Sequence, residues 1–472
     1  MRKFSKRILM VAGFNTTVNG INTFYKHLFD VFDEANVCVD ILNVAPVDRG
    51  LVDIDDCGVV GNIVNIWDGK EDLKKRFKES EEMFPFLSKV GVECCSAISS
   101  YVRFQTIHQM MQNNIYDAIF NNDGGYAGVT ALSMYYPFHK MIDVYEYTHN
   151  SLLFMPKEEE NMIKAHTAKM AKVMRYSMGE GYYLISQRDM DNIVMENKKK
   201  IGMLLDCEKF HSYQLPVEKK EDRVLYIGRM DKSSKNPELW FKTVAETGLS
   251  GLVIVPSAKN AKEAEELAGK YGITDCEVYH SISFDEKLKQ SARCKCFFIS
   301  SKHEMFGYTI YENLNLMPVV APNVYWANEV QRELPSVRIP KPGERPADLI
   351  MGAVRDYSEA GMEKQYGEVI RYRDETRAKW LEFLKNIPER RGKDSHKKVK
   401  NVELLETCKT LGNVLRAAKQ KMFAFEELDI IYRCLNPQKI IQTREKTYYG
   451  DIIQEAKTEK NNSLDAFFSC NG

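Results

Sequence analysis

The chain has 472 residues and carries 66 Lys and Arg side chains against 66 Asp and Glu side chains, so its formal net charge is zero. A chain of this length predicts two or three domains. The neutral balance excludes a global electrostatic attraction to nucleic acid or to an anionic membrane, so any such binding depends on a local patch. No stretch of the sequence offers the roughly 18 apolar residues that a membrane-spanning helix needs.

The 11 cysteines are scattered along the chain. Cys94-Cys95 and Cys294-x-Cys296 are the close pairs, and neither has zinc partners at ligand spacing. We therefore expect reduced, mostly buried thiols in a cytoplasmic protein, rather than disulfides or metal ligands.

In the first 190 residues, short apolar runs alternate with stretches that have the periodicity of amphipathic helices. This alternation predicts parallel βαβ units. Helices are expected over residues 21–33 and 162–175, and strands are expected in "RILMVAG", "CVDILNVA", "DAIFNN", "HKMIDVYEYTHN" and "GYYLISQ".

The charged, Pro-containing stretch "SYQLPVEKKEDR" precedes a second alternating series, whose expected strands lie in "VLYIGR", "GLVIVPS", "CEVYHS", "CKCFFISS" and "PVVAPN". The predicted fold class is α/β, with two Rossmann-like doubly wound domains that face each other across a cleft and bind ligands at the carboxyl ends of their strands. A helical C-terminal extension is expected beyond them. The expected divisions are residues 1–215, 216–370, a return helix over 371–387, a basic linker and helical extension over 388–457, and a flexible tail over 458–472.

The stretch "FFISSKHEMFGYTIYENLNLMPVVAP" carries two glutamates, Glu304 and Glu312. A strand ends at Ser300, and a helix is expected to begin near Gly307, so both carboxylates can project into one cleft. The free amides of a helix N-terminus favour an anion such as a diphosphate. The alternative is that Glu304 neighbours a helix cap and Glu312 is a solvated helix residue.

The motif "E-x-F-G" followed by the second glutamate resembles the signature of family 4 retaining glycosyltransferases with the GT-B fold. Upstream, "VLYIGRMDKSSKNPEL" resembles the strand, loop and helix that open the second domain of that family. The resemblance implies that Arg229 and Lys235 bind the diphosphate of the sugar donor, where two cations neutralise the leaving group. Without the resemblance, both would be taken as residues of a solvated loop.

The first domain resembles the same family. "MVAGFNTTVNGINTFYKHL" is similar to its first strand and glycine-containing loop, where Gly20 lets the backbone approach the donor closely. "VYEYTHNS" is similar to the strand end that places a histidine beside the donor sugar, here His149. The resemblance extends from residue 7 to about residue 387.

The resemblance implies a retaining transfer from a UDP-sugar, in which Glu312 binds the ribose and Glu304 and His149 lie at the donor sugar as the catalytic residues. The backbone amides of Phe306, Gly307 and Tyr308 would hold the phosphates. The second half contains no Asp-x-Asp metal signature. We therefore expect no obligatory cofactor or metal, with assistance by magnesium left open.

The C-terminal "EKNNSLDAFFSCNG" places Leu464, Phe467 and Phe468 in a polar tail. The spacing resembles the PIP-box by which proteins dock on sliding clamps, with Asn461 in place of the usual Gln, and the short clamp-binding peptides of T-even phage replication proteins. A one-turn helix would present the three apolar side chains to a pocket of the clamp. The alternative is that the aromatic pair folds back onto the enzyme.

A clamp-following enzyme acts on new DNA, and the layout of the chain resembles the DNA alpha-glucosyltransferases of T-even phages. The resemblance implies transfer of glucose, or of a pentose such as arabinose, to 5-hydroxymethylcytosine in double-stranded DNA, in the host cytoplasm and without a membrane. The basic residues 390–400 would help to hold the duplex, unless they form only a solvated linker. Two alternatives are an envelope polysaccharide or lipid-linked acceptor and a non-catalytic binding module of the same fold.

Overall fold

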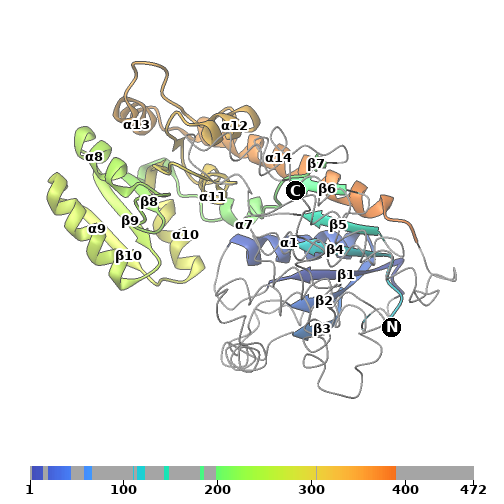
Figure 1. The fold of residues 1–472 in the computed structure, drawn as a ribbon. Helices are drawn as coiled ribbons and strands as arrows, with labels where there is room; N and C mark the ends of the chain where they lie inside the picture. Colours follow the sequence, from blue (N-terminus) through green and yellow to red (C-terminus); the bar gives the residue numbers. More distant parts are fainter. Residues whose placement is uncertain are drawn as a thin grey trace, which may run out of the picture. The chain divides into compact units, whose positions relative to one another are not determined.

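The computed structural model of the chain describes residues 3–13, 20–43, 58–65, 110, 114–122, 143–147, 181–184, 198–304 and 306–389. The chain divides into two compact units, Met1–Ile201 with Trp380–Gly472, and Gly202–Lys379. Figure 1 shows a parallel sheet in each unit. The helix expected over residues 162–175 and the helical extension expected over 388–457 lie outside the described residues. The predicted domain boundaries stay predictions.

The first unit contains a seven-stranded sheet in the order β3-β2-β1-β4-β5-β6-β7. Every neighbouring pair of strands in this sheet is parallel. Helix α1 (Gly20–Glu34) connects β1 to β2. The strands are β1 (Lys6–Ala12), β2 (Val37–Asn43), β3 (Val60–Asn65), β4 (Ala118–Asn122), β5 (Asp143–Tyr147), β6 (Gly181–Leu184) and β7 (Lys198–Lys200).

Trp380 anchors the end of the last helix, α14 (Glu359–Asn386), in the core of the first unit. Its ring is fully buried and lies 5.7 Å from Phe24 of α1 and 5.8 Å from Phe120 of β4, between ring centroids. Lys6 of β1 donates from Nζ to the carbonyl oxygens of Leu384 and Lys385, at 2.7 and 2.8 Å. The buried ammonium therefore satisfies carbonyl groups that the end of a helix leaves without partners.

A buried carboxylate joins three strands of this sheet. Asp40 of β2 is fully buried and accepts from Arg7 of β1, from the Tyr116 hydroxyl at 2.6 Å and from the backbone N–H of Asn62 in β3 at 3.0 Å. A side chain at position 61 would meet Asp40 Oδ1 at 2.5 Å, so the residue there is Gly61. A buried charge of this kind is stable only when it is paired, and this pairing fixes the register of the strands.

The second unit contains a five-stranded sheet in the order β10-β9-β8-β11-β12, and all its pairs are parallel. Its strands are β8 (Glu221–Ile227), β9 (Ser250–Val255), β10 (Cys276–His280), β11 (Cys294–Phe298) and β12 (Val319–Val320). Its helices are α7 (Cys207–His211), α8 (Pro237–Thr247), α9 (Ala258–Tyr271), α10 (Phe284–Ala292), α11 (Tyr308–Leu314), α12 (Tyr325–Glu333), α13 (Pro346–Arg355) and most of α14.

Three helices of the second unit, α8, α9 and α10, begin at residues whose chemistry favours that position. Pro237 is the first residue of α8, where its missing N–H costs nothing, and Gly248 ends the helix at φ 67°. Ser257 accepts at the start of α9 from Asn260 N at 3.3 Å. Ser283 accepts at the start of α10 from Glu286 N at 3.2 Å.

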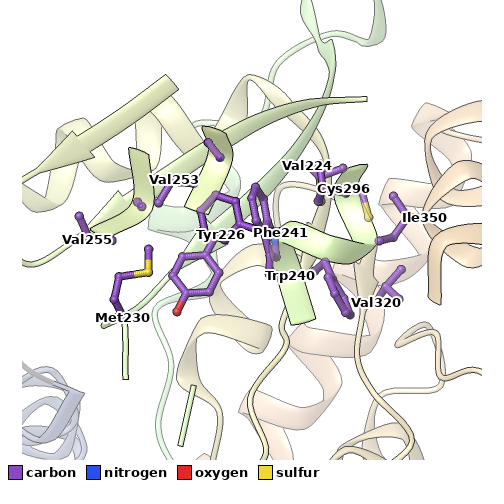
Figure 2. Close-up of a cluster of buried hydrophobic side chains, with 14 of the residues drawn as sticks. Val224, Tyr226, Met230, Trp240, Phe241, Val253, Val255, Cys296, Val320 and Ile350 are labelled. Carbon is purple, nitrogen blue, oxygen red and sulfur yellow. The ribbon is translucent and has the colours of Figure 1, made fainter. Parts of the chain in front are cut away.

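Trp240 occupies the centre of the hydrophobic core of the second unit (Figure 2). It is fully buried, its Nε1 donates to the Leu225 carbonyl at 3.1 Å, and its ring makes edge contacts with Tyr226 and Phe241. The indole N–H is thus satisfied inside an apolar cluster that joins α8 to the sheet. Figure 2 places Val253 and Val255 of β9, Cys296 of β11 and Ile350 of α13 in the same cluster.

The structure confirms the predicted α/β fold class with two parallel sheets, and each predicted strand overlaps an observed one. The helix expected over residues 21–33 is α1. Strands β3 and β7 were not predicted. Among the helices that the structure describes, none combines the length and the apolar character of a membrane span.

Lys220 is a buried cation in the second unit. It lies directly before β8 and is 7% exposed. Its Nζ donates to the Leu316 carbonyl at 2.6 Å and lies 5.4 Å from the centroid of the Tyr357 ring. Burial lowers the pKa of Lys220 from 10.5 to about 7. The amine therefore releases a proton in the folded chain far more readily than in the unfolded one.

This pKa predicts a pH dependence of stability. Between pH 7 and 10 the unfolded chain holds a proton that the folded chain has released, so the free energy of unfolding rises with pH. We expect Lys220→Met to flatten this rise, by at most about 1.4 kcal/mol per pH unit, in denaturant melts across this window. The exposed neighbour Lys219 supplies the control, since Lys219→Met should keep the wild-type slope. If the free energy of unfolding of Lys220→Met rises with pH as steeply as that of the wild type, Lys220 is not the source of the pH dependence.

Candidate functional site

The candidate site forms where β8 and β11 end. These strands are neighbours in the parallel sheet, so their carboxyl ends lie at the same edge. Two hydrogen bonds join the loop after β11 to the loop after β8. Lys302 N donates to the Ser234 carbonyl at 2.8 Å, and Ser300 Oγ donates to the Lys235 carbonyl at 3.0 Å. The backbone thereby holds the loop after β8 against the loop after β11.

Lys235 and Glu304 form an ion pair across these two loops. The ammonium of Lys235 donates to Glu304 Oε1, and the two side chains are 24% and 12% exposed. The sequence assigned the lysine to the donor diphosphate and the glutamate to the donor sugar. In the structure the two groups contact each other, which places a cation and a carboxylate side by side at the edge of the sheet.

Arg229 follows β8 and remains largely open to solvent, with 66% of its side chain exposed. Its nearest partner is Asp231, at 3.7 Å between Nη2 and Oδ2. The Ser233 hydroxyl donates to Asp231 Oδ1 at 2.6 Å and lowers the pKa of that carboxyl. The Tyr226 hydroxyl donates to the Arg229 carbonyl at 2.7 Å. The loop backbone is therefore fixed while the guanidinium stays exposed.

Gly307 lies directly before α11 in the left-handed conformation, with φ 70°. On either side of it, the Phe306 ring stacks on Tyr311 at 4.3 Å between centroids, and the Tyr308 hydroxyl donates to the Leu204 carbonyl at 3.0 Å. Burial raises the pKa of Tyr308 well above its usual value. Both side chains are thus engaged within the second unit.

Glu312 lies on α11 and is 7% exposed. Its Oε2 accepts from Lys287 Nζ of α10 at 2.8 Å. This lysine is a residue that sequence reasoning missed. The sequence predicted that Glu312 projects into a cleft. In the structure its carboxylate is largely buried and forms an ion pair with Lys287 of the neighbouring helix α10.

Not all predicted site residues join this group. Gly20 is the first residue of α1 and belongs to the first unit. His149 lies outside the described residues, as do Leu464, Phe467 and Phe468 of the tail. In the part of the chain that the structure describes, no group of three His, Cys, Asp or Glu side chains is arranged to hold a metal ion.

One known protein family matches part of the second unit. Residues 208–350 match the model of the family described as glycosyl transferases group 1. This segment includes Arg229, Lys235, Lys287, Glu304 and Glu312. No curated protein matches the chain significantly in sequence.

The chain is similar in fold to several solved structures. HepE of Anabaena, solved in complex with UDP and glucose, is 14% identical, with a TM-score of 0.50 over 80% of this chain and 97% of that one. Sucrose-phosphate synthase of Thermosynechococcus elongatus is 14% identical, with a TM-score of 0.54 over 80% and 96%. A UDP-forming trehalose-phosphate synthase of Burkholderia xenovorans is 11% identical, with a TM-score of 0.58 over 81% and 99%. These likenesses show that the chain shares its fold with these proteins.

The left-handed conformation of Gly307 predicts that an alanine destabilises the protein at position 307 but not at position 367. An alanine there would hold a strained φ and approach Ile310 Cδ1 to 3.2 Å, so we expect Gly307→Ala to lower the free energy of unfolding by about 1–2 kcal/mol. Gly367 lies within α14 with nothing within 4 Å of its added Cβ. Gly367→Ala should therefore be neutral or stabilising. Equal changes of both variants in denaturant melts would argue against the left-handed conformation.

Proposed function

We propose that this chain is a retaining glycosyltransferase that takes its sugar from a UDP-sugar. The observation that carries the proposal is the meeting of Lys235 and Glu304 at the carboxyl ends of β8 and β11, inside the segment that matches the glycosyltransferase family. A cation there suits the diphosphate of a donor, and a carboxylate suits the hydroxyls of its sugar.

The proposed reaction breaks the bond between C1 of the sugar and the β-phosphate oxygen, which leaves with the bonding electrons as UDP. The acceptor hydroxyl oxygen forms the new bond to C1 on the same face of the ring. Its proton passes to the departing diphosphate. Lys235 and Arg229 stabilise the negative charge that grows on the diphosphate in the transition state.

The remaining roles follow the resemblance. Glu312 accepts hydrogen bonds from the ribose hydroxyls, the amides of residues 306–308 hold the phosphates, and Gly20 allows close approach of the first domain's backbone. The resemblance assigns both His149 and Glu304 to the donor sugar. The reaction as proposed requires no metal, and magnesium would only assist.

We further propose 5-hydroxymethylcytosine in phage DNA as the acceptor. This step rests on the sequence, through the clamp-binding resemblance of Leu464, Phe467 and Phe468 and the layout shared with T-even phage DNA alpha-glucosyltransferases. The acceptor hydroxyl of a hydroxymethylated base must reach the donor, which favours extrusion of the base from the helix. An envelope polysaccharide or lipid-linked acceptor is the competing choice.

The catalytic proposal predicts a measurable transfer. We expect incubation with UDP-glucose or another UDP-sugar to add one sugar mass to hydroxymethylated DNA and none to plain DNA, measured by mass spectrometry of the nucleosides. Glu312→Gln removes charge-assisted hydrogen bonds of about 1.5–3 kcal/mol, so kcat/KM should fall about 10- to 150-fold. The exposed Glu363 on α14 supplies the matched control, because Glu363→Gln should keep full activity.

Two outcomes would contradict parts of this proposal. If no UDP-sugar modifies hydroxymethylated DNA, the acceptor is wrong. If, in addition, the protein hydrolyses no nucleotide sugar and binds no UDP, the chain is a binding module of the same fold rather than an enzyme.

The resemblance of the tail to clamp-binding peptides predicts that clamp binding can be removed without loss of transfer activity. We expect a truncated variant that lacks residues 461–472 to lose binding to the phage sliding clamp while it keeps transfer activity on free DNA, because the tail lies outside the residues that match the glycosyltransferase family. Phe467→Ala with Phe468→Ala should reproduce the loss, and Ser469→Ala should not. Surface plasmon resonance on immobilised clamp measures this. Clamp binding that survives the aromatic substitutions would refute the motif.

A further inference from the structure

We propose that Lys287 is a positioning residue for the Glu312 carboxylate and that the pair makes the donor site prefer a ribonucleotide to a deoxyribonucleotide. The inference rests on the proposed function, which assigns Glu312 to the ribose hydroxyls. It adds a residue outside the resemblance and a specificity that follows from the geometry of the pair.

The first step of the argument is the burial of Glu312. Its side chain is 9% exposed, and a carboxylate removed from water needs a countercharge or a set of hydrogen bonds. Lys287 Nζ provides the countercharge at 2.8 Å from Oε2. Among the residues that the structure describes, Lys287 is the cation paired with this carboxylate.

The second step is that Lys287 is itself held in place. Its ammonium lies 4.4 Å from the centroid of the Phe284 ring, one turn earlier on α10, which favours a cation. The Phe284 ring packs against Phe210 of α7, with centroids 6.0 Å apart. The hydroxyl of Ser283 fixes the start of α10. The lysine therefore has a defined position without any ligand.

The third step concerns Oε1, the carboxylate oxygen of Glu312 that Lys287 does not contact. Lys287 contacts Oε2, and no described donor contacts Oε1 of Glu312. An ionised carboxylate only accepts hydrogen bonds, so it matches the hydroxyl donors of a sugar. The contact with Lys287 sets the rotation of the carboxylate, which aims the remaining acceptor oxygen in one direction. A ribose presents two neighbouring hydroxyls to such an acceptor, whereas a 2′-deoxyribose presents one.

The test compares the binding of UDP and 2′-deoxy-UDP by calorimetry. The wild-type chain should prefer UDP. We expect Lys287→Met to weaken UDP binding about tenfold and to change 2′-deoxy-UDP binding little, so that the preference collapses. Lys287→Arg should retain most of the preference. Lys289 lies exposed on the same helix, and Lys289→Met changes the charge equally without touching the pair, so it should behave as wild type.

A double-mutant cycle separates positioning from general damage. If Lys287 acts through Glu312, Lys287→Met should cost little once Glu312→Gln is present. In the transfer reaction, Lys287→Met should raise KM for the donor and leave kcat nearly unchanged. Lys287→Gln, which keeps a hydrogen-bond donor, serves as the second variant if the methionine variant does not fold.

The outcomes distinguish this inference from the proposed function. A wild-type chain that binds neither nucleotide would overturn both. A wild-type chain that binds UDP, together with a Lys287→Met variant that loses both nucleotides equally or keeps the full preference, would overturn the positioning role and leave the proposed function intact.

Discussion

The parallel direction of the five strands β8 to β12 is the constraint on which the candidate site depends. Because every strand points the same way, each connection after a strand leaves from one edge of the sheet. Neighbouring strands bring together loops that are far apart in sequence, and Lys235 and Glu304 meet although 69 residues separate them. The Trp240 core and the capped helices hold this edge in place. The chemistry of the site is thus a consequence of strand order.

Hydrophobic runs in the sequence were sufficient to predict the five-stranded sheet and the inner strands of the seven-stranded sheet, but not the two edge strands of the latter. Buried apolar runs mark predicted strands such as β1, β9, β11 and the fully buried β2. The two unpredicted strands, β3 with the sequence VGNIVN and β7 with the sequence KKK, are the two edges of the seven-stranded sheet. Edge strands carry charges, glycine and polar residues that discourage pairing with other chains. In β3 and β7, these polar and charged residues interrupt the apolar run by which a strand is recognised in a sequence.

The sequence named candidate residues for the site but not the contacts between them. The resemblance identified Arg229, Lys235, Glu304 and Glu312, and all four lie in the second unit. The ion pairs Lys235–Glu304 and Lys287–Glu312 join segments 69 and 25 residues apart. No local period or motif in one sequence encodes such a contact, because it depends on which strands are neighbours. Lys287 therefore carried no signal before the fold was known.

The ion pairs also suggest different roles for the two cations of the proposed donor site, Lys235 and Arg229. Lys235 is already neutralised by Glu304, so a diphosphate that binds beside it meets a cation whose charge is shared. Arg229 is two-thirds exposed, and among the described residues its ion-pair partner is the distant Asp231, so its planar guanidinium can turn toward two phosphate oxygens at once. In the proposed reaction, Lys235 would hold a fixed position between phosphate and sugar, whereas Arg229 would follow the diphosphate as its charge grows. A fixed cation orients the donor, and an adaptable one stabilises the leaving group.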